Sequence, residues 1–283
     1  MKEYTLGLYE KSMPSSLSWE ERLMEAKRAG FDFLEISIDE TEERLSRLNM
    51  GREERQGILR AMDQAGLPIR TMCLSGHRRY PLGSLDAQVR GRAMEIMEQA
   101  LGLADSLGIR IIQLAGYDVY YEEGNGDTRR YFEENLRRAV DMAACRGILM
   151  GFETMETEFM NTVEKAMEYV AKMDSPYLGV YPDLGNITNA ALLYGTDVSG
   201  DLRKGRGKLV AMHLKETKPG IFREVPFGEG HVDFETGIHT AWECGVRRFV
   251  TEFWYTGNPG WRDDLDGAAL RMRGILDRGL ETR

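Results

Sequence analysis

The feature that most constrains the fold is the alternation of short apolar runs with segments of helical periodicity along the 283-residue chain. The runs are rich in branched and aromatic residues and are apolar throughout, which is typical of parallel strands covered on both faces. Eight such runs occupy residues 4–9, 31–38, 69–74, 109–115, 148–153, 178–183, 209–214 and 248–253. Eight strand–helix units predict an α/β fold of the closed (β/α)8-barrel type. An open doubly wound sheet is the alternative, but no GxGxxG turn supports it.

Helix signals between the runs support this division. Ser18 and Glu21 have the spacing of a capping box, and Gly30 ends the first helix before the next run. Glycines stand at equivalent places before four later runs, at Gly66, Gly108, Gly147 and Gly245. No linker, low-complexity tract or charge block divides the chain. We therefore expect residues 1–283 to form one domain with eight helices.

Composition and charge argue against several classes of function. The net charge of −9 repels polyanions, so nucleic acid is not an expected partner. The N-terminal residues lack the apolar stretch of a signal peptide, and no run approaches the roughly 18 apolar residues of a membrane span. The three cysteines are scattered without a CxxC pair, as is usual in a reducing compartment. We expect a cytoplasmic protein without a membrane partner, and the oligomeric state, a homo-oligomer included, stays open.

Candidate metal ligands stand where the last four predicted strands end. Glu153 and Asp183 are the last residues of their runs, and His213 and Glu252 are the penultimate residues of theirs. Strand ends meet at one rim of a barrel, so three carboxylates and an imidazole would converge there. The carboxylates would repel one another without a cation, and this donor set suits one divalent ion: Mn²⁺, Mg²⁺, Co²⁺ or Zn²⁺. The alternative is four separate strand-end polar groups, each paired with Lys or Arg.

Longer motifs resemble a known family nearly from end to end. They read LGLYEK, FDFLEISIDET, MCLSGHRRYPLGS, IRIIQLAGYDVYYEE, YPDLGN, HLKETKPGIFREVPFGEGHVDF and TEFWY. The chain resembles the L-ribulose-5-phosphate (L-xylulose-5-phosphate) 3-epimerases, within the xylose-isomerase-like TIM-barrel superfamily. The resemblance implies a metal-dependent isomerase of carbohydrate metabolism that acts on a ketopentose 5-phosphate. It assigns the metal to the same four residues; residues 189–206 and the end of TEFWYTGNPGW do not match the family pattern.

Inversion at C3 of a ketose asks for two proton carriers. The C3 proton next to the ketone is only weakly acidic, and an ion that chelates O2 and O3 would stabilise the enediolate. One group removes the proton and another returns one on the opposite face. Glu153 and Glu252, on the fifth and eighth strands, are the expected catalytic pair. The alternative is that both are only ligands and that water or His77 moves protons.

Five residues are predicted to contact the substrate. Glu156 and Arg223 match positions where related ketose epimerases hold substrate oxygens. The HRRYPLGS loop carries His77, Arg78, Arg79 and Ser84 at the barrel mouth, and of these His77 and Arg79, with Lys218 in KETKPG, are expected to bind the phosphate. The alternative is that they are solvated loop residues.

Weaker candidates and other functions remain. Lys11 and Glu35 stand near strand ends and are candidate contacts only, whereas His231 and His239 are expected to be structural. A related ketose or hexulose-phosphate epimerase or isomerase would share the metal site. A non-catalytic sugar-phosphate sensor is a third function, against which the intact Glu153 and Glu252 argue.

Overall fold

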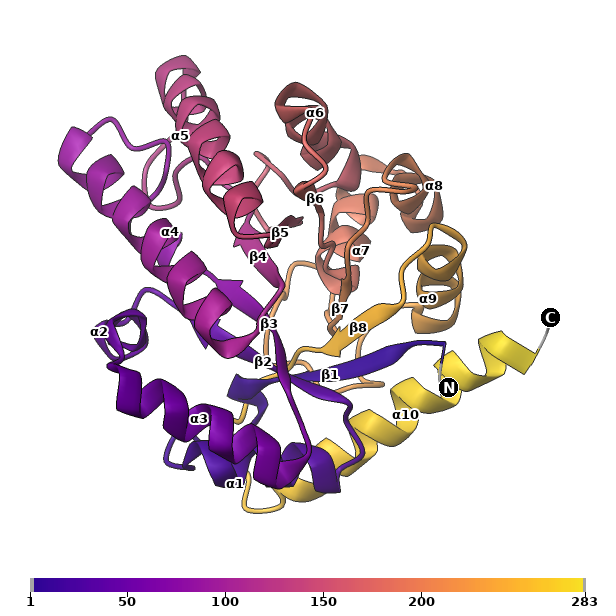
Figure 1. Ribbon diagram of the computed structural model, residues 1–283. Helices are drawn as coiled ribbons and strands as arrows, with labels where there is room; N and C mark the ends of the chain where they lie inside the picture. The colour runs from indigo at the N-terminus through magenta and orange to yellow at the C-terminus, as the bar shows by residue number, and fades with distance from the viewer. Residues whose placement is uncertain (1–2, 282–283) are drawn as a thin grey trace.

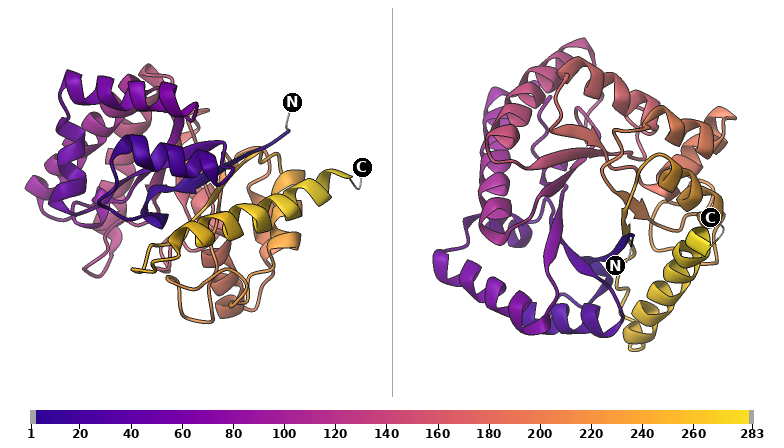
Figure 2. Two further views of the ribbon diagram at one scale, coloured as in Figure 1. Left: turned by 90° about the horizontal axis from the view of Figure 1, so that it is seen from below. Right: turned by 45° about the vertical axis from the view of Figure 1, so that its right-hand side comes forward.

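The computed structural model describes residues 3–281 and has the predicted (β/α)8-barrel architecture, with the strands ringed by helices (Figures 1 and 2). The strands are β1 (Thr5–Tyr9), β2 (Phe33–Ile38), β3 (Ile69–Leu74), β4 (Ile111–Ala115), β5 (Leu149–Glu153), β6 (Leu178–Val180), β7 (Met212–Leu214) and β8 (Arg248–Thr251). Each lies within its predicted run. They pair in parallel in the order β6-β5-β4-β3-β2-β1-β8-β7.

β6 and β7 do not form a continuous hydrogen-bonded ladder, and isolated backbone bridges close the barrel between them. Isolated parallel bridges join Val180 to Leu209 and Asp183 to His213. The His213 amide donates a hydrogen bond of 2.9 Å to the carbonyl oxygen of Pro182. These two strands are shorter than predicted because no continuous ladder links them. The closure places Asp183 directly beside His213.

The described residues form ten α-helices, two more than predicted. They are α1 (Trp19–Arg28), α2 (Glu42–Ser46), α3 (Arg52–Ala65), α4 (Ala87–Leu107), α5 (Gly126–Cys145), α6 (Val163–Met173), α7 (Leu184–Tyr194), α8 (Val198–Lys204), α9 (Phe234–Glu243) and α10 (Trp261–Glu281). Short 3-10 turns are η1 (Glu10–Ser12), η2 (Arg47–Asn49) and η3 (Gly76–Arg78). The additional helices, α2 and α8, are short segments that begin at the capping side chains of Thr41 and Asp197.

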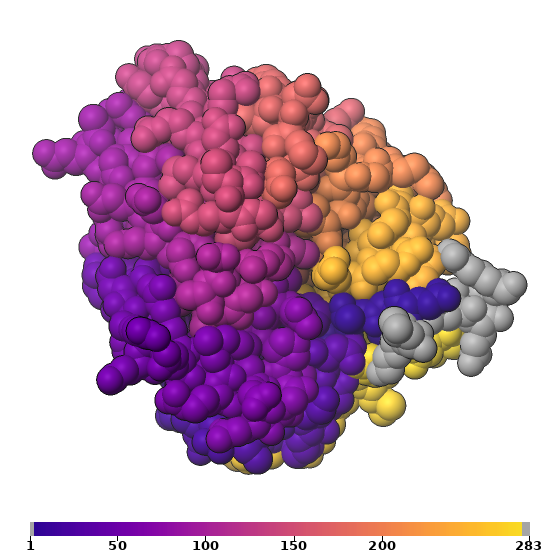
Figure 3. Space-filling view, in the orientation of Figure 1, coloured from indigo at the N-terminus to yellow at the C-terminus, as the bar shows by residue number. Residues whose placement is uncertain are grey.

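Local signals fix where the longer helices begin and end. The Ser18 hydroxyl accepts from the Glu21 amide at 3.2 Å, and the Glu21 carboxylate accepts from the Ser18 amide at 2.7 Å, so the predicted capping box is present. Gly66 ends α3 with a φ of 59°, a left-handed conformation that few other residues adopt without strain. The first and last elements also meet. The N-terminal end of β1 lies beside α10 at the surface (Figure 3), and the hydroxyl of Tyr4, just before the strand, donates to Asp277 Oδ1 at 2.6 Å.

The buried apolar residues of the described chain form three clusters. The largest fills the layer between strands and helices, a second contains residues such as Tyr9, Phe33 and Tyr181 on the interior side of the strands, and a small third cluster joins Ala115, Tyr117 and Met155. All three cysteines are free. Within residues 3–281, no helix combines the length and apolar character needed to span a membrane. The interior cluster lies beneath the rim on which the charged residues described next converge.

Candidate metal centre

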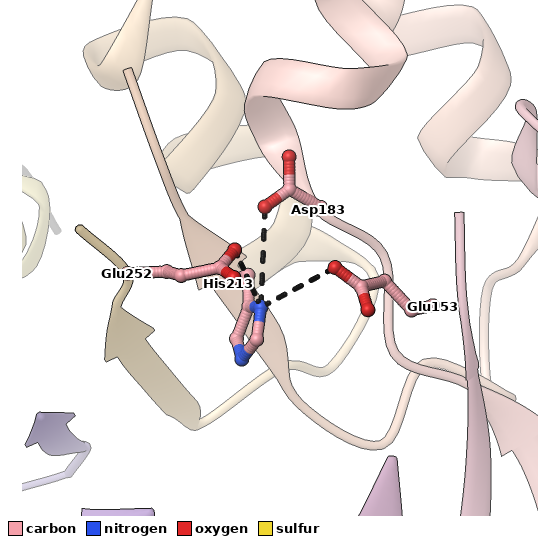
Figure 4. Close-up of side chains that lie close together, drawn as sticks. All are labelled: Glu153, Asp183, His213 and Glu252. Atoms are coloured by element: carbon pink, nitrogen blue, oxygen red, sulfur yellow. Dashed lines mark ion pairs between the residues drawn. The ribbon is translucent and has the colours of Figure 1, made fainter. Parts of the chain in front are cut away.

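Four side chains able to bind a metal ion converge at the C-terminal rim of the barrel (Figure 4). Glu153 ends β5, Asp183 caps the N-terminus of α7 after β6, His213 lies in β7, and Glu252 directly follows β8. Their ligand atoms lie within 4.8 Å of one another, and all four residues are buried. The structure thus brings the four predicted ligands together, because parallel strands end at one rim.

The arrangement of donor atoms fits a divalent cation. His213 Nδ1 lies 3.0 Å from Glu252 Oε2, 3.7 Å from Glu153 Oε1 and 3.9 Å from Asp183 Oδ2. Asp183 Oδ2 and Glu252 Oε2 are buried and accept no hydrogen bond from the described residues. A buried carboxylate oxygen without a donor is costly, and a cation would satisfy it. Three carboxylates and one imidazole suit Mn²⁺, Mg²⁺, Co²⁺ and Zn²⁺ alike.

Glu35, in β2, orients His213 from the other side of the imidazole ring. Its Oε1 lies 2.6 Å from His213 Nε2, and its Oε2 accepts from Thr71 Oγ1 at 2.7 Å and from the Tyr181 hydroxyl at 2.9 Å. With the proton on Nε2, the lone pair of Nδ1 faces the carboxylates, as is usual for a metal-binding histidine. The sequence signal for Glu35 is a lone acid in FLEISI, a strand that is buried throughout.

Lys215 adds one buried cation to this group. Its Nζ lies 3.3 Å from Asp183 Oδ2 and 3.7 Å from Glu252 Oε2. Burial raises the pKa of Asp183 well above its usual range; Lys215 opposes this, and the charges of Glu252 and Glu153 add to it. Burial also raises the pKa of Glu153, whereas at Glu252 Lys215 and His213 outweigh burial and lower the pKa. One ammonium group therefore leaves the three carboxylates short of positive charge.

A cavity of about 200 Å³ opens onto this acidic group. Glu153 and Glu252 line it, together with two predicted substrate contacts, Glu156 and Arg223. Arg223 Nη2 lies 3.8 Å from Glu156 Oε1, which also accepts from the Tyr120 hydroxyl at 2.8 Å. The cavity is smaller than the roughly 300–1,000 Å³ pockets of drug-sized ligands, so it suits a small polar molecule.

Three other predicted substrate contacts do not line this cavity. His77 is buried; its Nε2 lies 3.1 Å from the carbonyl oxygen of Ala93, and burial lowers its pKa to about 4. Arg79 is exposed and pairs with Glu42 at 2.7 Å. Lys218 is partly exposed and likewise absent from the cavity wall.

The HRRYPLGS loop nevertheless supplies a cation to the cavity, at Arg78. Arg78 ends the 3-10 turn η3, where successive side chains point about 120° apart. The turn carries Arg78 over the Tyr120 ring, with its guanidinium carbon 4.6 Å from the ring centroid, and leaves Arg79 outside. Lys11, a weaker candidate, also lines the cavity and pairs with Asp39. The loop and both of its arginines were identified from the sequence, but Arg79 was chosen as the phosphate contact, whereas Arg78 is the one that lines the cavity.

Comparison with known proteins agrees with this architecture. The family model described as "Xylose isomerase-like TIM barrel" matches residues 23–271. Solved structures of similar fold include a D-tagatose 3-epimerase-like protein, with a TM-score of 0.78, 18% identity and coverage of 98% of this chain and 97% of that one. Another is an L-ribulose 3-epimerase, with a TM-score of 0.74, 18% identity and coverage of 99% and 95%. At these identities the likeness concerns the fold alone.

Sequence similarity to curated proteins is much higher. The L-ribulose-5-phosphate 3-epimerase UlaE of Shigella boydii serotype 18 is 46% identical over 254 residues, which are 89% of this chain and 88% of that protein. The protein of the same name from Escherichia coli O157:H7 has the same identity and coverage. The chain therefore belongs to the xylose isomerase-like TIM-barrel family, and within it to the group that contains the L-ribulose-5-phosphate 3-epimerases.

Proposed function

We propose that this protein is a metal-dependent isomerase that inverts C3 of a ketopentose 5-phosphate and so interconverts L-xylulose 5-phosphate and L-ribulose 5-phosphate. The observation that carries the proposal is the position of Glu153 and Glu252. Both line the cavity, and they reach the shared centre from opposite sides, with Asp183 and His213 between them (Figure 4). The name of the 46% identical relatives supplies the substrate class.

Inversion needs groups on both faces of C3. A single base would return the proton to the face it came from unless the intermediate turned over in the cavity. Two carboxylates on opposite sides avoid this: one removes the C3 proton, and the other delivers a proton to the opposite face. Glu153 and Glu252 have this arrangement, and the roles exchange when the reaction runs in reverse.

The remaining residues bind and orient the substrate. Glu153, Asp183, His213 and Glu252 would hold the ion. When bound, a divalent ion supplies Lewis acidity that stabilises negative charge on the substrate oxygens next to C3. Glu156 and Arg223, paired on the cavity wall, are placed to bind a hydroxyl and a carbonyl oxygen of the sugar. Asp183 and His213 would act only as ligands that hold the ion in place, and they transfer no proton themselves.

The test is an assay of purified protein that has been stripped of metal and reloaded with one defined ion. L-Xylulose 5-phosphate and L-ribulose 5-phosphate should interconvert, and in deuterated water the product should carry solvent deuterium at C3 from the first turnover. Faster turnover of another ketose or of a hexulose phosphate would identify that compound as the substrate instead. Absence of C3 exchange with every ketose tested would overturn it in favour of a non-catalytic sensor.

A further inference from the structure

The positively charged side chains that line the cavity differ in whether a carboxylate of the protein already pairs with them. Lys11 pairs with Asp39, and Lys215 pairs with Asp183 and Glu252. The third, Arg223, pairs with Glu156, as described above. Each of these cations is thus held by a carboxylate of the protein itself.

Arg78 is the exception. It lines the same cavity, yet among residues 3–281 no carboxylate oxygen lies within ion-pair distance of its guanidinium group, and its Nε is buried without a hydrogen-bond partner. Charged guanidinium groups that are partly buried normally have an acidic or carbonyl partner. An unpaired one on the wall of a cavity indicates a ligand with negative charge.

The position of Arg78 is fixed before any ligand binds. Its amide donates to the carbonyl oxygen of Ser75 at 3.0 Å, and its guanidinium group stacks over Tyr120. Tyr120 is itself held by the hydrogen bond from its hydroxyl to Glu156 and by its packing on Tyr117, with ring centroids 5.1 Å apart. A stacked planar group with free N–H donors can bind a phosphate through two parallel hydrogen bonds, without first being ordered.

We propose that Arg78, stacked on Tyr120, binds the phosphate group of the substrate and makes the enzyme select phosphorylated over free ketopentoses. This inference rests on the proposed function, because it concerns the same cavity and the same substrate. The phosphate contact is thus assigned to Arg78 and not to its exposed neighbour Arg79. Ser75, just before the HRRYPLGS loop, lines the same cavity and carries a second hydrogen-bond donor, its hydroxyl.

The two adjacent arginines provide a matched pair of variants. Arg78→Met should lower kcat/KM for L-xylulose 5-phosphate roughly 10- to 100-fold more than kcat/KM for free L-xylulose, mainly through KM, since a charged hydrogen bond to a remote group is lost. Arg79→Met should leave the ratio of the two kcat/KM values unchanged. Arg78→Lys, which keeps the charge but loses the planar fork, should give an intermediate ratio.

Inorganic phosphate tests the site without turnover. It should bind the wild-type protein and the Arg79→Met variant with the same affinity, measured by calorimetry, and Arg78→Met should weaken binding by at least tenfold. Equal losses on phosphorylated and free sugar, or equal phosphate affinity in both variants, would overturn the assignment to Arg78. If the wild type epimerises no ketopentose phosphate, the proposed function fails instead, and phosphate binding still decides the role of Arg78.

Discussion

Two clusters of buried charge lie at the same rim of the barrel and are built in opposite ways. After β1, the Glu10 carboxylate is surrounded by three arginines, Arg22, Arg44 and Arg47, and also accepts from the Ser37 amide at 2.7 Å. After β5 to β8, three carboxylates share one imidazole and one lysine. In the first cluster one carboxylate is matched by several donors of the chain, whereas in the second the cations are outnumbered and two buried carboxylate oxygens, Asp183 Oδ2 and Glu252 Oε2, accept no hydrogen bond from the described residues.

The pKa values reflect this difference. Burial alone would raise the pKa of Glu10, but Arg47, Arg44 and Arg22 outweigh it and lower the pKa. At Asp183 the opposite holds, because burial and the neighbouring carboxylates together outweigh Lys215. A buried acid whose partners belong to the chain serves the fold, whereas a group of acids short of positive charge indicates a bound cation.

The largest effect is expected from the two glutamates that serve as proton carriers. Glu153→Gln and Glu252→Gln should each lower kcat by roughly 10²–10⁴, because each removes a general acid or base while an amide oxygen can still face the ion. The assay should be run with metal content measured for each variant. Glu158→Gln, an exposed acid on the loop after β5, is the matched control and should have no effect.

In deuterated water, one of these variants should still exchange the C3 proton of one epimer without completing inversion. Its remaining carboxylate can act on one face only. Near-normal epimerisation by either variant, with metal bound, would show that the proton carriers are other groups.

The cluster of Glu10 and its three arginines should affect the stability of the fold and not the rate of catalysis. Glu10→Gln should lower the free energy of unfolding by about 3–5 kcal/mol at pH 7, because it leaves buried arginines without their partner. Urea unfolding of wild type and variant measures the difference, with Glu158→Gln again as the control. A variant as stable as wild type would mean that solvent already screens this cluster.

The same pair of proteins tests the pH dependence. The pKa of Glu10 is lower in the folded state than its ordinary value of 4.5, so the unfolded state binds more protons as the pH falls. The stabilisation by Glu10 is complete above about pH 4.5 and is lost as the pH falls through its lower folded-state pKa. The gap in stability between wild type and Glu10→Gln should therefore narrow below about pH 4.5. A constant gap down to pH 3 would contradict the assignment.

A smaller effect is expected at Glu35, which contacts the candidate centre only through His213. Glu35→Gln should weaken Mn²⁺ binding by about 10- to 100-fold, the usual cost of losing the partner that orients a ligating histidine. Calorimetric titration gives the affinity, and Thr71→Val, which removes only one donor to Glu35, should have a lesser effect. Unchanged affinity in Glu35→Gln would mean that the β7 backbone alone orients the imidazole.

Much of the fold and the four converging residues could be predicted because both depend on strand position. A strand end specifies the rim, so Glu153, Asp183, His213 and Glu252 could be placed together without knowing any loop. The extra helix α2 could not be predicted in the same way, because it consists of five residues started by one capping hydroxyl. Local capping of this kind has a weak sequence signal.

Side-chain direction within loops was the harder problem. Arg78 and Arg79 are chemically identical neighbours, and a single 3-10 turn decides which one faces the cavity. Lys215 was not identified, and Glu35 was named only as a candidate contact and not as the partner of His213, for a related reason. Their roles depend on what lies across the barrel from them, and strand pairing alone does not specify this.

The most direct test of the contrast between the two clusters is calorimetric titration of Mn²⁺ into metal-free protein at pH 7. Wild type and His239→Ala, which changes an exposed histidine on α9, should each bind one ion per chain. His213→Ala should lose this binding and activity together while it remains folded by circular dichroism. Stoichiometric binding retained in His213→Ala, or no binding by wild type, would contradict the assignment of the acidic cluster as the metal site.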